Sequence, residues 1–203
     1  MGTLLSEPVA AGVNQGWFRV LPTEVFKIIL AGPRNVGKTS LLRRYLSGRF
    51  EPQYTATIGV DMNVASLDFP DGKVVLDVID LAGQQSFISL RNRFYQGTHH
   101  LILVFDMTDR PTFEEVPKWY DAITQGACPS PGMHLTGSLV GNKADMVQKL
   151  ALTSQEGQDL AELLSMQYFE ASAKTGQNVS EIFLHAAISC RMTLQSLRQS
   201  KQV

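Results

Sequence analysis

A glycine-rich segment near the start of the chain has the spacing of a phosphate-binding loop. Gly32, Gly37, Lys38 and Thr39 fit the pattern G-x-x-x-x-G-K-[ST]. Such a loop, when it opens a helix, presents backbone N–H groups and the positive end of the helix dipole to an anion. The Lys38 ammonium adds a positive charge for the phosphates, and the Thr39 hydroxyl is suited to Mg²⁺. The motif therefore predicts a site for a nucleoside phosphate and a magnesium ion.

A second motif indicates which base those phosphates carry. Asn142-Lys143-Ala144-Asp145 follows an apolar segment at 135–140 that we interpret as a strand. An aspartate carboxylate accepts hydrogen bonds from both the ring N–H and the exocyclic amine of guanine, a donor pair that adenine lacks. By itself the tetrapeptide is equally typical of a polar turn. Downstream of a phosphate loop it predicts guanine.

The elements that must position these motifs alternate between strand and helix. The turn Pro70-Asp71-Gly72 predicts a hairpin, since Asp-Gly supplies the positive φ that tight turns need. Apolar strands between amphipathic helices indicate an α/β fold, with ligands at the carboxyl ends of the strands. We expect a six-stranded, mainly parallel sheet with one antiparallel strand, flanked by about five helices. The predicted strands are 25–31, 60–69, 73–79, 101–105, 135–140 and 168–170, and the predicted helices begin after Gly37 and at 112–123, 153–166 and 180–199.

Composition excludes several other classes of protein. The 203 residues are 44% hydrophobic and 18% charged, which fits one globular domain. A formal charge of −1 disfavours nucleic-acid binding, and Cys128 and Cys190 are too few and too far apart for a disulfide framework. No apolar run reaches the roughly 18 residues of a membrane span. His99 and His100 lack a third ligand at suitable spacing, so we interpret them as edge residues of a strand.

Three further segments extend the pattern: Thr57-Ile58-Gly59, Asp80-Leu81-Ala82-Gly83-Gln84 and Ser172-Ala173-Lys174. With the two motifs above, the chain resembles the Ras superfamily of small GTPases, and within it the Rab family. The resemblance covers about residues 25–188. It implies a P-loop NTPase G domain at 23–200, followed by a short tail at 201–203. Residues 1–22 mix Gly, Ala, Pro and Thr without periodicity, which predicts a flexible N-terminal arm.

The resemblance also implies roles for individual residues. Gln84 would orient the attacking water and act with Lys38 in catalysis, because phosphoryl transfer depends on positioning and charge stabilisation. Thr39, Thr57 and Asp80 would hold Mg²⁺, and the Thr57 loop would be ordered with GTP and released with GDP. The remaining contacts with GTP or GDP would come from Gly32, Arg34, Asn35, Val36, Gly37, Ser40, Phe50, Tyr54, Gly83, Asn142, Lys143, Asp145, Ser172, Ala173 and Lys174.

Two departures from the Rab pattern bear on activity and partners. Arg34 stands where the family usually carries a small residue. Its cation would either substitute for the arginine that an activating protein supplies, or obstruct Gln84 and that arginine. We favour obstruction and therefore slow hydrolysis. Met62, Ile79 and Phe94 occupy the positions of the exposed hydrophobic triad of Rabs, and their altered identity predicts private effectors and unusual exchange and activating proteins.

Both ends of the chain also differ from a typical Rab. The chain stops at Val203 without the cysteines that Rabs prenylate, and Cys190 falls inside the last predicted helix. Gly2 opens a segment that fits the N-myristoylation pattern, although ordinary small-residue N-termini match it too. A single acyl chain would give weak, reversible membrane contact.

Together these features predict a monomeric GTPase that switches between GTP and GDP and recruits effectors in membrane or ciliary traffic. We expect it in the cytoplasm, peripherally on membranes or at the base of the cilium. The alternative is a GTP-bound structural subunit of a transport complex with little turnover. Arg34 and the altered triad favour the alternative, whereas Thr57 and Gln84 oppose it. An ATP-using kinase is disfavoured, because the second motif specifies guanine and the length leaves no room for a lid domain.

Overall fold

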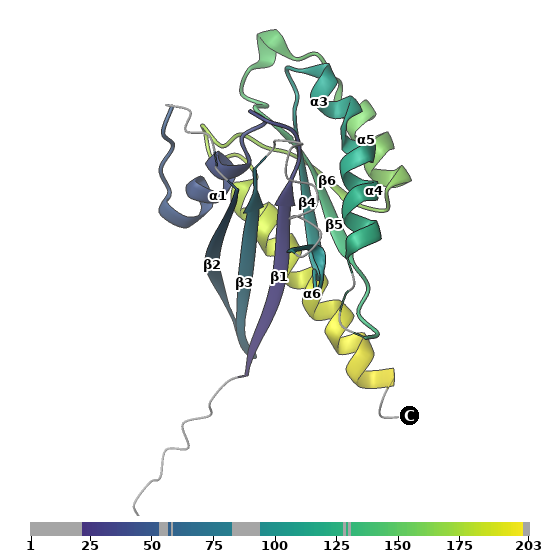
Figure 1. The fold of residues 1–203 in the computed structure, drawn as a ribbon. Helices are drawn as coiled ribbons and strands as arrows, with labels where there is room; N and C mark the ends of the chain where they lie inside the picture. Colours follow the sequence, from purple (N-terminus) through teal and green to yellow (C-terminus); the bar gives the residue numbers. More distant parts are fainter. Residues whose placement is uncertain are drawn as a thin grey trace, which may run out of the picture.

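The computed structural model describes residues 22–52, 57, 59–82, 94–127, 129 and 131–200. Its centre is a six-stranded sheet in the order β2-β3-β1-β4-β5-β6 (Figure 1). The β2–β3 pair is antiparallel and the other four pairs are parallel. The predicted α/β fold is therefore confirmed. The strands are β1 (Thr23–Ala31), β2 (Val60–Phe69), β3 (Gly72–Leu81), β4 (His100–Asp106), β5 (Thr136–Asn142) and β6 (Gln167–Glu170).

Helices cover both faces of the sheet. The cluster of buried apolar side chains on one face includes residues of α1 and α6, and the cluster on the other includes residues of α4 and α5 (Figure 1). Neighbouring residues of β1 alternate between the two clusters, because successive side chains of a strand point to opposite faces. The helices are α1 (Lys38–Ser47), α3 (Arg110–Glu114), α4 (Val116–Gly126), α5 (Ser154–Leu163) and α6 (Val179–Ser200), with a 3₁₀ turn at Val147–Lys149.

The single helix predicted at 112–123 is two helices in the structure. It is interrupted at Glu115, and Pro117 lies in the first turn of α4. Proline has no N–H to donate, and its ring crowds the carbonyl four residues earlier, so it is tolerated at the start of a helix but not inside one. The break follows from this one residue.

The hairpin between β2 and β3 forms as predicted, but the reason given for Gly72 is wrong. Phe69 pairs with Gly72 across the turn, and Gly72 does not have a positive φ. A Cβ atom at Gly72 would instead lie 2.6 Å from the backbone oxygen of Pro22. The glycine is required by this close approach of the chain that leads into β1.

The prediction that both neighbouring histidines are edge residues is wrong for His100. This side chain is fully buried, and its ring nitrogens lie 2.6 Å from the Thr136 hydroxyl and 2.9 Å from the Ser138 hydroxyl. β4 is a central strand, buried along its whole length, so its first residue is covered as completely as its last.

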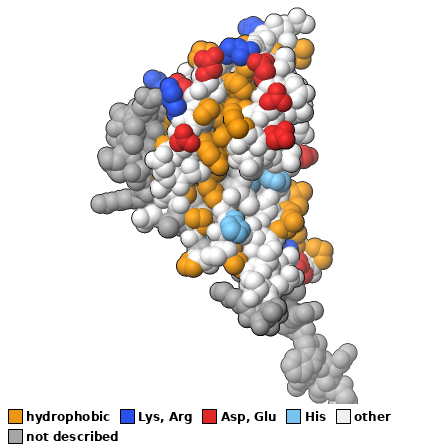
Figure 2. Space-filling model, turned by 90° about the vertical axis from the view of Figure 1, so that its right-hand side faces the viewer, with side chains coloured by type: hydrophobic (Ala, Val, Ile, Leu, Met, Phe, Trp, Pro, Cys, Tyr) orange, Lys and Arg blue, Asp and Glu red, His pale blue; other side chains and the backbone are white. Residues whose placement is uncertain are grey.

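The outer surface of the helices includes exposed apolar side chains. Leu184, Ile188 and Met192 are spaced four residues apart on α6, whereas the residues of this helix that are buried include Ala186, Ala187 and Cys190. Figure 2 shows hydrophobic side chains running down the middle of one face, with charged side chains gathered at its upper end. None of the helices in the described ranges is both long and apolar enough to cross a membrane.

Candidate functional site

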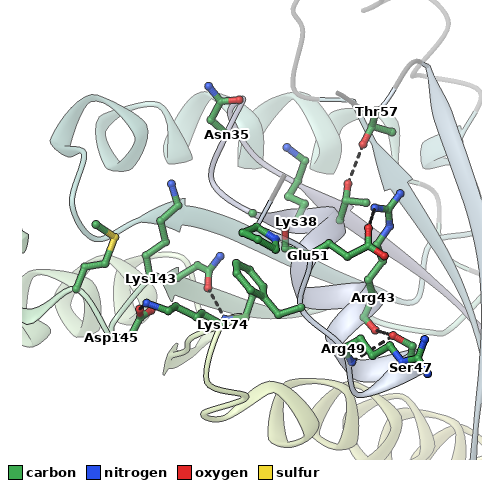
Figure 3. Close-up of a pocket in the computed structure, with 18 of the residues that line it drawn as sticks. Asn35, Lys38, Arg43, Ser47, Arg49, Glu51, Thr57, Lys143, Asp145 and Lys174 are labelled. Carbon is green, nitrogen blue, oxygen red and sulfur yellow. Dashed lines mark hydrogen bonds and ion pairs between the residues drawn. The ribbon is translucent and has the colours of Figure 1, made fainter. Parts of the chain in front are cut away.

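A cavity of about 490 Å³ lies beside the loops that follow the carboxyl ends of β1 and β5 (Figure 3). In a parallel sheet this is the edge where ligands bind. Most residues of the two predicted motifs meet there. The predicted residues that line it are Arg34, Asn35, Gly37, Lys38, Thr39, Ser40, Phe50, Thr57, Asn142, Lys143, Asp145, Ala173 and Lys174.

The phosphate loop has the backbone that its glycines permit. Gly32 and Gly37 have φ angles of 139° and 94°, and Asn35 adopts a left-handed conformation with φ of 62°. A side chain at Gly37 would collide with the Asn142 amide. Lys38 is buried, and its ammonium donates to the carbonyls of Gly32 and Pro33 at 2.8 and 2.7 Å. The loop therefore holds its cation against its own backbone, at the wall of the cavity.

Thr39, Thr57 and Asp80 bring three oxygen-bearing side chains together. The two hydroxyls are 2.7 Å apart, and the Thr39 hydroxyl also donates to Asp80 Oδ2. Asp80 is fully buried, and its Oδ1 has no hydrogen-bond partner among the residues that the structure describes. Burial raises the pKa of this carboxyl group, because loss of solvent disfavours its charged form. Hard oxygen ligands of this kind suit Mg²⁺, so the set fits the ion.

Asn142 connects the phosphate loop to the loop that follows β6. Its amide nitrogen donates to the Val36 carbonyl at 2.7 Å, and its amide oxygen accepts from the Ala173 N–H at 3.2 Å. The side chain is almost fully buried. Asn142 therefore fixes the distance between the two walls of the cavity.

Asp145 is oriented by the same loop. The Ser172 hydroxyl donates to Asp145 Oδ1 at 2.7 Å, and the Lys174 ammonium lies 3.8 Å from Oδ2. The carboxylate lines the cavity between Lys143 and Lys174 (Figure 3). It is a fixed acceptor pair for a ligand with two adjacent N–H donors.

Not every predicted residue lines the cavity. Gly32, Val36, Asp80 and Ser172 lie behind it and hold the lining residues through the bonds described above. Tyr54, Gly83 and Gln84 lie outside the described residues, as does Gly2. Sequence reasoning missed six lining residues. They are Arg43, Ser47, Arg49, Glu51, Pro52 and Met146.

Two of these six lining residues, Arg43 and Ser47, could have been predicted from their spacing in the sequence. Ser40, Arg43 and Ser47 are spaced by three and four residues, so on a helix that starts at Lys38 they share one face. No sequence pattern predicts the 3.4 Å ion pair between Arg43 and Glu51, because it depends on the path of the chain after α1.

The predicted effector triad is wrong at Ile79. Its side chain is 2% exposed, because β3 lies between β2 and β1 and this residue belongs to the buried cluster on one face of the sheet. Phe94 is partly buried against the same cluster, whereas Met62 on the edge strand is 60% exposed. Of the three, Met62 alone offers an open apolar side chain.

Comparison with known proteins agrees with this geometry. The family model described as "Ras family" matches residues 27–192. The chain is 37% identical over 179 residues to Ras-related protein Rab-30 of Homo sapiens, which covers 88% of this chain and 85% of the relative. The chain belongs to the Ras family.

Two further relatives are of the same type. Ras-related protein SEC4 of Candida albicans is 34% identical over 163 residues, covering 80% of this chain and 76% of the relative. Ras-related protein RabC of Dictyostelium discoideum is 39% identical over 161 residues, covering 78% and 80%. The protein is thus a Rab-like small GTPase of membrane traffic, and the alternative of a GTP-bound structural subunit with little or no turnover is not favoured. Proteins of this family bind GTP and GDP with Mg²⁺.

Proposed function

We propose that this cavity binds GTP and GDP, and that the Rab-like GTPase hydrolyses GTP there to time the recruitment of its effectors. The observation that carries the proposal is the placement of two chemistries on one cavity. The phosphate loop with Lys38 forms one end, and the Asp145 carboxylate, held by Ser172, forms the other. A guanine nucleotide has a matching anion and a matching pair of N–H donors.

Different residues of the cavity would bind the phosphates, the base and Mg²⁺. Backbone N–H groups of the loop and the first turn of α1 would meet the phosphates, with the Lys38 ammonium supplying charge. Phe50 would pack against the base, and the Ala173 N–H would face its exocyclic oxygen. Thr39, Thr57 and Asp80 would hold Mg²⁺, which supplies positive charge to the phosphates. The buried Oδ1 of Asp80 supports this, because an unpartnered carboxylate oxygen is costly without a cation.

Switching would depend on Thr57. Its hydroxyl lies 2.7 Å from that of Thr39, so one ion can be reached by both. Loss of the terminal phosphate would remove a partner from Thr57 and release its loop. Effectors that bind Met62 and its surroundings would sense that release. Catalysis by Gln84 rests on the sequence motif.

We further propose that Arg34 slows hydrolysis. It is exposed at the rim of the cavity, on the loop that would surround the phosphates. A long cation at that point would occupy space that the attacking water and the arginine of an activating protein require. The protein would then depend on an activating partner. Its place would be the cytoplasm, with peripheral membrane contact that acylation of Gly2 would strengthen.

The test is single-turnover phosphate release from purified, GTP-loaded protein with Mg²⁺. Gln84→Ala should slow release roughly tenfold or more, because the attacking water would lose its orientation. Gln155→Ala, which changes an exposed residue on α5, is the matched control and should leave the rate unchanged. Equal rates in wild type and Gln84→Ala would contradict the proposed catalysis. A preference for ATP over GTP in competition would contradict guanine binding itself.

A further inference from the structure

Lys143 has a backbone conformation that calls for a reason. Its φ is 66°, in the left-handed region that residues with a Cβ rarely adopt. Such strain persists only where the surrounding structure imposes it, and it concentrates at functional sites. The residue follows the last position of β5 and lines the cavity. Its side chain is 32% exposed.

The ammonium of Lys143 is held by a carboxylate outside the cavity lining. Lys143 Nζ lies 2.5 Å from Oδ2 of Asp106, the last residue of β4, whose side chain is 7% exposed. In the sheet register Asp106 pairs with Asn142, and the Met107 N–H donates to the Asn142 carbonyl at 3.0 Å. The neighbouring ends of β4 and β5 therefore place the Asp106 carboxylate next to the backbone of Lys143.

The carboxylate is itself fixed. Asp106 Oδ1 accepts from the backbone N–H of Thr108 at 2.8 Å and from the Thr108 hydroxyl at 2.7 Å. With Oδ1 engaged on Thr108, Oδ2 is directed to Lys143. Hydrogen bonds between two charged groups are among the stronger contacts in proteins. The geometry thus forms a chain of contacts from Thr108 through Asp106 to Lys143.

We infer that Asp106 is a positioning residue for the nucleotide base, which it serves by fixing Lys143. The inference rests on the proposed function, because the hydrocarbon stem of Lys143 can contact the base only if a guanine nucleotide binds in the cavity that Lys143 lines. Lysine has a long flexible stem that loses rotamer freedom when it is ordered. Because Asp106 orders it before the ligand arrives, binding does not carry that cost.

Lys143 and Asp145 would contact different parts of the base. A hydrocarbon stem packs on the ring face and does not read hydrogen-bond donors, whereas Asp145 reads them. Loss of the Asp106 carboxylate should therefore weaken guanosine and inosine nucleotides by the same factor. Inosine lacks the exocyclic amine, so Asp145 alone should distinguish the two.

The experiment is a double-mutant cycle on the full chain with Mg²⁺, read by release of fluorescent GDP. Asp106→Asn and Lys143→Met, which keeps the stem without its charge, should each speed release about three- to tenfold. The double variant should release no faster than Lys143→Met, because Asp106 acts through the ammonium. Asp109→Asn, the same change at an exposed position three residues on, is the control.

Several outcomes would overturn the inference. If Asp106→Asn speeds release equally in the Lys143→Met background, Asp106 supports the fold and not Lys143. If Asp106→Asn changes the ratio of the affinities for GDP and IDP, Asp106 affects recognition of the exocyclic amine and not packing on the ring face. Should Asp106→Asn fail to fold, Thr108→Ala keeps the carboxylate and removes one of its bonds; it should act in the same direction, and unchanged release would refute the chain of contacts.

Failure of the proposed function gives a different result. In that case wild-type protein itself would not retain GDP, and no comparison between variants would be needed. If wild type retains GDP while Asp106→Asn and Thr108→Ala both match it, the proposed function stands and the positioning role is refuted.

Discussion

The buried imidazole of His100 makes the stability of this protein sensitive to acid. The ring lies under α6, and the Ser138 hydroxyl joins its Nε2 to Nδ1 of His185 at 2.9 Å on each side. Burial, and secondarily the neighbouring His185, lower the pKa of His100 from 6.5 to about 3. His100 cannot take a second proton in this network without placing a charge in the core, because its side chain is fully buried.

The sign of the effect follows from proton binding. An unfolded chain protonates His100 near pH 6.5, whereas the folded chain protonates it only near pH 3. The unfolded state therefore binds more protons in this window. Stability is complete above the unfolded pKa and declines as the pH falls from about 6.5 towards about 3. At about pH 5 the loss from this residue is about 2 kcal/mol.

Urea unfolding at about pH 7.5 and about pH 5, with GDP and Mg²⁺ held constant, measures this loss. His100→Gln removes the titrating group. Between the two pH values, the free energy of unfolding of this variant should therefore decrease less than that of wild type, by a difference of about 2 kcal/mol. His134→Gln replaces an exposed histidine and should behave as wild type. If His100→Gln keeps the full acid sensitivity of wild type, the burial of a neutral imidazole is not its cause.

Two further predictions concern charged residues. Arg34→Gly should raise the single-turnover rate of GTP hydrolysis on the order of tenfold, and an unchanged rate would refute obstruction. Arg191→Met should lower the free energy of unfolding by roughly 2 kcal/mol in urea titration, because it removes a partner 2.9 Å from the buried Glu24. The matched change Arg43→Met breaks an exposed pair and should cost about 0.5 kcal/mol or less, so equal losses in the two variants would contradict the reasoning.

Interactions between distant segments could not be predicted from the sequence. The bond from Asn142 to the Val36 carbonyl joins residues 106 positions apart, and the ion pair of Lys143 with Asp106 joins residues 37 apart. Each depends on which strands are neighbours and in which register. Strand order follows from packing of the whole sheet, which no local pattern specifies.

The sequence by itself determined the phosphate loop, the guanine motif and the α/β fold. Each is encoded by residue types at short spacing, because backbone conformation at glycine and the alternation of apolar residues are local properties. Only the tertiary structure decided which side chains are covered. Ile79 is buried and Met62 open, although they face each other across β2 and β3, since one strand is central and the other lies at the edge. Burial depends on neighbours that lie far away in the chain, so it is decided when the sheet assembles.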